Sequence, residues 1–110
     1  MSTETRKILA QSSPTAGLLT DVYTVGALTQ TVISTLTVCN RSNIGTTFRI
    51  SVAIAGALDT NSQYLYYDVY IDANETFAST IGITLGAGDV VRMFSGSGNL
   101  TINLFGVELS

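Results

Sequence analysis

The clearest structural signal in the chain is the run Thr31-Val-Ile-Ser-Thr-Leu-Thr-Val-Cys-Asn40. Its side chains alternate in character, with Val32, Leu36 and Val38 on one face and mainly threonines on the other. Successive side chains of a β-strand point to opposite faces of the sheet, and β-branched residues fit that pleated surface well. The run therefore predicts a half-buried strand.

The same signal recurs on both sides of this run. Further strands are expected at 18–25, 48–54, 65–71, 77–85, 90–94 and 100–109, and the pattern allows a short one at 7–10. Turn-forming Gly, Asn and Asp residues separate them, while Gly82 and Gly106 indicate a bend and a bulge within two of the runs. Seven or eight strands without helical periodicity predict an all-β fold, an antiparallel, jelly-roll-like β-sandwich.

The segment before the first long strand has a different character. It is polar apart from a short apolar group at 8–10, and it contains the only proline, Pro14. We therefore expect an N-terminal arm at residues 1–17, joined to a β-sandwich domain at residues 18–110. Since no stretch has the length and hydropathy of a signal peptide or a membrane span, we expect synthesis in a cytoplasm and no membrane partner.

Composition narrows the chemistry. The 110 residues suit one domain, and only 12% of them are charged, against roughly 25% in an average soluble domain. Without histidine there is no imidazole for a zinc site or for a Ser-His or Cys-His pair, and Cys39 has no disulfide partner. A net charge of -3 disfavours a phosphate-binding surface. We therefore expect no enzymatic activity, no cofactor, no metal and no nucleic-acid partner.

Acidic residues near the turns are the strongest remaining candidates for chemistry. Asp68, Asp72 and Glu75, with Asp59 upstream, offer the oxygens that calcium binds and the paired carboxylates that glycoside hydrolysis uses. Their spacing lacks the alternating ligands and the glycine of a calcium loop, and the chain has no tryptophan to wall a sugar cleft. Solvated turn carboxylates are the preferred interpretation.

Tyrosines cluster in the middle of the chain. Strict alternation places Tyr64, Tyr66 and Tyr70 on the outer face of a strand and Tyr67 on its core face. Such an outer face could bind a sugar, a nucleic-acid base or a protein, but the segment lacks the basic residues that single-stranded nucleic acid needs. Two interpretations stay open, a protein contact and an ordinary outer sheet face.

The low charge favours association with other chains. A small sandwich with so few charged residues must expose Thr, Ser, Ala, Gly, Asn and Tyr, and such a surface packs readily against other proteins. Phe105 lies next to Leu104 in the last predicted strand, so one of these large side chains could face outward. We expect a homo-oligomer whose interface includes the face formed by Tyr64, Tyr66 and Tyr70, or Phe105.

Six blocks of the chain have a recognisable order. They are Leu19-Thr-Asp-Val-Tyr-Thr-Val25, Val32-Ile-Ser-Thr-Leu-Thr-Val-Cys-Asn-Arg-Ser42, Thr47-Phe-Arg49, Gln63-Tyr-Leu-Tyr-Tyr-Asp68, Gly88-Asp-Val-Val-Arg92 and Asn103-Leu-Phe-Gly-Val-Glu108. In this order they resemble a family of small β-sandwich virion proteins encoded by tailed bacteriophages, cyanophages among them, and by prophages. The similarity covers about residues 7–109.

This resemblance implies a structural role without catalytic residues. It implies a capsid decoration (cement) protein, a homotrimer seated where major capsid protein subunits meet in the virion. The N-terminal arm, with Ile8 and Leu9, would then reach a neighbouring chain. A tail, neck or baseplate protein of the same phage is the alternative, and a carbohydrate-binding module that uses the tyrosine face is a third interpretation.

Overall fold

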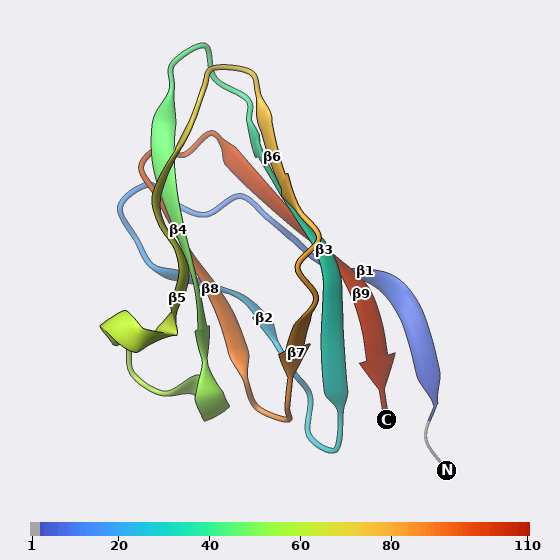
Figure 1. Ribbon diagram of the computed structural model, residues 1–110. Helices are drawn as coiled ribbons and strands as arrows, with labels where there is room; N and C mark the ends of the chain where they lie inside the picture. Colours follow the sequence, from blue (N-terminus) through green and yellow to red (C-terminus); the bar gives the residue numbers. More distant parts are fainter. Residues whose placement is uncertain (1–2) are drawn as a thin grey trace.

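The computed structural model describes residues 3–110, in which β-strands are the dominant secondary structure (Figure 1). The strands are β1 (Glu4–Ser12), β2 (Thr20–Thr24), β3 (Gln30–Asn40), β4 (Thr46–Ala53), β5 (Tyr64–Ile71), β6 (Thr76–Ser79), β7 (Ile83–Leu85), β8 (Val90–Ser95) and β9 (Leu100–Leu109). Two 3-10 turns, η1 (Ile54–Gly56) and η2 (Asn61–Gln63), lie between β4 and β5. No helix in this part of the chain is long and apolar enough to cross a membrane.

The strands form two antiparallel sheets that pack face to face. One sheet has the order β1-β9-β3-β6, with β7 also paired to β3, and the other has the order β2-β8-β4-β5. β6 and β7 occupy one interrupted strand position along β3, and between them Gly82 has a left-handed φ of 67°, which favours glycine. The eight resulting positions follow the strand order of a jelly roll. The predicted all-β sandwich is therefore confirmed.

The core lies between the two sheets. Leu100, Ile102 and Leu104 of β9 are fully buried, as the shared face of that strand predicts. Fully burying a side chain of this size stabilises the fold by about 1.5–3 kcal/mol. The other large side chains that are almost or completely buried come from β3 and from the facing sheet: Ile33, Leu36, Val38, Phe48, Ile50, Val91 and Met93.

A bulge in β3 changes which side chains face the core. The pairing of β3 with β9 shifts between Ile33 and Thr35, so one extra residue enters β3 there. An extra residue reverses the alternation on its far side. Ile33 is consequently buried and Val32 faces outward. The predicted inward face of this run is correct at Leu36 and Val38 and wrong at Val32.

The N-terminal segment differs from the arm expected at residues 1–17. Residues 4–12 form β1, which pairs with β9 along its length, and backbone hydrogen bonds between Thr3 and Ser110 extend the ladder. This segment is thus an edge strand of the sandwich, although its first two residues lie outside the described residues. Its charges and weak alternation concealed a strand whose partner lies at the far end of the sequence.

Candidate contact surfaces

The outer face of the four-stranded sheet carries a cluster of side chains around Arg49. The guanidinium carbon lies 4.1 Å from the centre of the Tyr67 ring and 5.1 Å from that of Phe94. The same guanidinium donates two hydrogen bonds to Asp68, at 2.6 and 3.2 Å. A planar guanidinium suits both stacking on aromatic rings and a two-point bond to a carboxylate. We call these four residues the Arg49 cluster.

The ion pair sets the charge state of the Arg49 cluster. Hydrogen bonding to Arg49 holds the pKa of Asp68 below its usual value, and the same bond raises the pKa of Arg49. Both groups therefore stay charged at neutral pH. Water reaches this pair, so screening limits its contribution to stability and its main effect is to order the surface.

A bulge in β5 decides which tyrosines face outward. Tyr67 and Asp68 together oppose one residue of β4, and Asp68 has a left-handed φ of 53°. The extra residue puts Tyr67 on the outer face and Tyr66 on the core side. The Tyr66 hydroxyl lies 2.6 Å from that of Ser79, and its ring meets Phe77 edge-on. The faces predicted for Tyr66 and Tyr67 are therefore wrong.

The other two tyrosines of the predicted face lie apart. Tyr64 meets Tyr67 edge-to-face, with ring centres 5.1 Å apart, and its hydroxyl donates to Asp59 at 3.1 Å. Burial and this hydrogen bond raise the pKa of Tyr64. Tyr64, Tyr67 and Asn61 line a shallow hollow, whereas Tyr70 is exposed at the far end of β5. A Tyr64–Tyr67 pair thus replaces the predicted three-tyrosine face.

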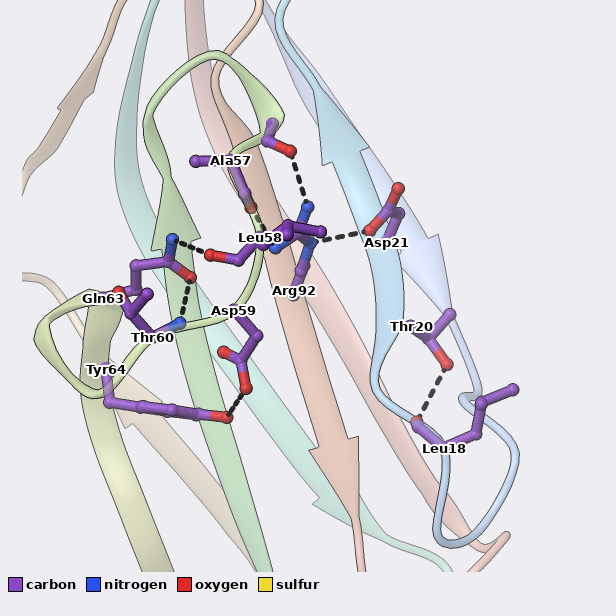
Figure 2. Close-up of polar contacts among 11 residues, drawn as sticks. Leu18, Thr20, Asp21, Ala57, Leu58, Asp59, Thr60, Gln63, Tyr64 and Arg92 are labelled. Atoms are coloured by element: carbon purple, nitrogen blue, oxygen red, sulfur yellow. Dashed lines mark hydrogen bonds and ion pairs between the residues drawn. The ribbon is translucent and has the colours of Figure 1, made fainter.

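The connection between β4 and β5 is held against the sheet by Arg92 (Figure 2). Its guanidinium donates to the carbonyl oxygens of Gly56 and Ala57, at 3.1 and 2.8 Å, and to Asp21 of β2 at 3.0 Å. These bonds join β2, β8 and the connection. Arg92 therefore serves the fold rather than a ligand.

The outer face of the five-stranded sheet is uncharged at its centre. Phe105 of β9 is paired with Ile8 of β1 on one side and with Thr35 of β3 on the other. We call the outward residues of the two central strands the neutral face. They are Gln30, Val32, Ser34, Thr35, Thr37 and Cys39 of β3, and Thr101, Asn103, Phe105, Val107 and Leu109 of β9.

The structure brings together two of the predicted contact residues on this side. The side chain of Ile8 is 53% exposed, and Phe105 beside it is half-buried. Leu9, in contrast, lies at a bulge of β1 and packs against the core. Leu9 is therefore unsuited to the contact predicted for it, because its side chain already has a partner within the fold.

Asn40 is a structural residue that the sequence did not single out. Its buried amide donates to the carbonyl oxygens of Ile44 and Asp72, at 3.0 and 3.1 Å, and its own oxygen accepts from the backbone N–H of Ser42. These bonds join the β3–β4 loop to the β5–β6 turn. Because Asp72 is distant in sequence, local spacing gives no sign of the contact.

A second polar network lies toward the other end of the sandwich. The Tyr23 hydroxyl donates to Glu108 at 2.6 Å and lies 2.8 Å from the Thr31 hydroxyl, while Lys7 pairs with Glu108 at 2.9 Å. Hydrogen bonds from Tyr23 and then Lys7 lower the pKa of Glu108, and burial raises the pKa of Tyr23. This network ties β1, β2, β3 and β9 together.

The predicted acidic residues do not converge. Asp68 is bound to Arg49, Asp59 accepts from Tyr64, and the carbonyl of Asp72 accepts from the backbone of Glu75 across a tight turn. Within residues 3–110, no three carboxylate or thiol side chains are grouped so that they could hold a metal ion.

Comparisons with protein-family models, curated proteins and solved structures gave no match to this chain.

Proposed function

We propose that this chain is a non-enzymatic structural protein of a phage virion, a decoration protein that bridges neighbouring major capsid protein subunits. The observation that carries the proposal is the neutral face, an uncharged surface over the two central strands of a jelly-roll sandwich, which suits assembly with other protein chains. Jelly rolls are a common architecture of viral capsid domains, and the motif resemblance supplies the kind of particle.

The chemistry of the neutral face suits contact between protein chains. Protein interfaces have few charged residues at their centre, are enriched in aromatic residues there, and have a polar rim. Phe105 on this face and the adjoining Ile8 of β1 form an apolar pair, and Thr35 and Asn103 lie beside Phe105 on the neighbouring positions of β3 and β9. We assign the face to contacts between copies in a homotrimer.

A trimer would strengthen a shell through repeated contacts. Each copy in the trimer offers the same surface to the shell. Three modest contacts with the shell then act together, and the combined binding exceeds that of any single contact. A chain that bridges two subunits in this way resists their separation under the internal pressure of packaged DNA.

Two other assignments have weaker support. A tail, neck or baseplate protein could use the same neutral face and is distinguished by its abundance. A carbohydrate-binding module would use the hollow at Asn61, Tyr64 and Tyr67. Arg49 already stacks on the Tyr67 ring, and the Tyr64 hydroxyl already donates to Asp59, so both groups that would bind a sugar have partners within the chain.

The test is the copy number of the chain in purified virions of the phage that encodes it, measured by quantitative mass spectrometry. A decoration protein should be present in proportion to the major capsid protein. A count matching a single ring or fibre would move the assignment to the tail, neck or baseplate. Absence from the particles would overturn the proposal.

A further inference from the structure

One end of the sandwich is built from apolar loops. The β2–β3 loop contains Gly-Ala-Leu-Thr at 26–29, the β4–β5 connection begins with Ile-Ala-Gly-Ala-Leu at 54–58, and the β7–β8 turn contains Gly-Ala-Gly at 86–88. All three reach the lower end of the view in Figure 1. These three stretches contain no charged residue, although Asp59 and Asp89 directly follow two of them, and we call the three stretches the apolar tip.

Backbone contacts fix these loops to one another. The N–H of Gly88 donates to the carbonyl oxygen of Val25 at 3.0 Å. The Asp89 carboxylate accepts from the backbone N–H groups of Ala55 and Gly86, at 2.9 and 2.8 Å. The carboxylate next to the tip is thus engaged with backbone, and the apolar tip is a preformed surface.

Three large aliphatic side chains project from the tip into water. Leu28 is 94% exposed, Leu58 is 88% exposed and Ile54 is 80% exposed. Turns normally use Gly, Asn, Asp, Ser or Pro, which suit the backbone and cost nothing in water. The strand predicted at 48–54 includes Ile54, but β4 ends at Ala53 and Ile54 is the first residue of η1, outside the sheet.

Leu28 is unfavourable for the isolated fold in two ways. Its side chain gains no burial, and its φ of 59° is a left-handed conformation that a branched side chain adopts at a steric cost. Glycine or asparagine would relieve that cost. A leucine in this position is therefore explained by a contact outside the chain.

Three loops at the other end of the sandwich are rich in charged, hydroxyl and amide residues, although Ile44 in one of them and Leu18 in the nearby β1–β2 loop are exposed. They read Arg-Ser-Asn-Ile-Gly at 41–45, Asp-Ala-Asn-Glu at 72–75 and Gly-Ser-Gly-Asn at 96–99. The molecule therefore has one end suited to water and one end suited to an apolar partner.

The size and charge of the apolar tip limit the kinds of partner that it can bind. The Cα atoms span 48 × 27 × 20 Å, and the strands run along the longest direction, so the end is about 27 by 20 Å across (Figure 1). The apolar tip covers only part of that cross-section. It is therefore a small surface beside the roughly 800 Å² per partner that a stable two-protein interface buries, and the tip alone would not hold a dimer. The three loops also lack the basic and aromatic residues of membrane-surface segments. A small apolar contact with another protein, repeated many times over a particle, is compatible with the small area and with the absence of basic and aromatic residues.

We infer that the apolar tip docks into an uncharged, apolar recess of the capsid protein, with Leu28 as its central side chain. The inference rests on the proposed function and deepens it by dividing the surface between two partners. The neutral face contacts other copies of the chain, and the apolar tip contacts the shell.

The test measures binding of the full-length chain to phage particles assembled without it. Leu28→Asn should weaken binding by about tenfold or more for each contact, the loss expected when a buried leucine is removed. Because asparagine tolerates a left-handed φ, the variant should melt at or above the wild-type temperature. Ile44→Asn is the matched control, since Ile44 is an exposed aliphatic residue at the polar end. Its binding should equal that of the wild type.

The outcomes separate the two proposals. If the wild type binds and Leu28→Asn binds equally well, the inference is overturned and the proposed function stands. If the wild type does not bind, the proposed function fails and the inference fails with it. Leu28-dependent binding to phosphatidylcholine vesicles would assign the tip to lipid, and a change of oligomeric state in Leu28→Asn would assign it to a second copy. Either result would also overturn the inference.

Discussion

Two neighbouring tyrosines of β5 have opposite environments, which gives a test at the scale of single residues. Tyr66→Ala removes a ring packed on Phe77 and the hydroxyl contact with Ser79, so the free energy of unfolding should fall by about 2–3 kcal/mol. Tyr67→Ala removes an exposed ring and should cost less than about 1 kcal/mol. Urea unfolding measures both values. Equal losses would show that the bulge in β5 does not set the faces as described.

Glu108 gives a prediction about pH. The pKa of Glu108 in the folded protein is lowered from its ordinary value of about 4.5. The charged Glu108 therefore stabilises the fold above pH 4.5, and this contribution is lost as the pH falls through the folded-state pKa. Glu108→Gln should therefore be less stable than the wild type at pH 7, and the difference should shrink toward pH 3. Unfolding free energies from urea titrations at the two pH values measure this.

A control carboxylate separates this network from general acid effects. Glu4 is paired with Arg6 at an exposed position of the same strand as Lys7. Glu4→Gln should leave stability nearly unchanged at both pH values. A Glu108→Gln variant with a constant deficit from pH 7 to pH 3 would contradict the charged role of Glu108.

At the scale of elements, β1 is the part of the fold with the clearest consequence for truncation. Deleting residues 1–12 removes one neighbour of β9 and exposes a strand edge, so the shortened chain should melt far below the full-length chain or aggregate. Differential scanning calorimetry measures the change. Leu9→Ser is the milder variant, and it should lower the free energy of unfolding by about 1–2 kcal/mol because Leu9 packs against the core. An unchanged melting temperature in both variants would mean that β1 is a dispensable arm.

The elements themselves could largely be predicted from the sequence, whereas their irregularities could not. Alternation located β3, β4, β8 and β9, and Gly82 marked the break between β6 and β7. The bulges near Ser34 and at Asp68 follow no strong residue signal, because serine and aspartate also occur in regular strands and turns. Each bulge reverses a face, and for this reason Val32, Tyr66 and Tyr67 were placed wrongly.

The contact surfaces were predicted less completely than the strands. The pairing of Ile8 with Phe105 depends on the register of β1 against β9, which joins the two ends of the chain and leaves no local pattern. The apolar tip could not be predicted from the sequence for a similar reason. Its three loops look like ordinary turns one at a time, and only the jelly-roll topology gathers them at one end.

At the scale of the whole molecule, most basic charge is used internally. The ion pairs within residues 3–110 are Arg6–Glu4, Lys7–Glu108, Arg49–Asp68 and Arg92–Asp21. Arg41 instead donates to Ser13, Gly98 and Thr101. Little positive charge is therefore left unpaired to attract an acidic partner over a distance.

The place of β9 has a consequence for how the chain folds during synthesis. β9 lies between β1 and β3 at the centre of the five-stranded sheet, yet it follows every other strand in the sequence. At about 5–20 residues per second, a ribosome releases β1 and β3 several seconds before the strand that joins them. The larger sheet therefore cannot close until β9 has left the ribosome. Folding of this sheet should therefore be slow and should wait for the synthesis of β9, and premature pairing of the earlier strands is the main hazard.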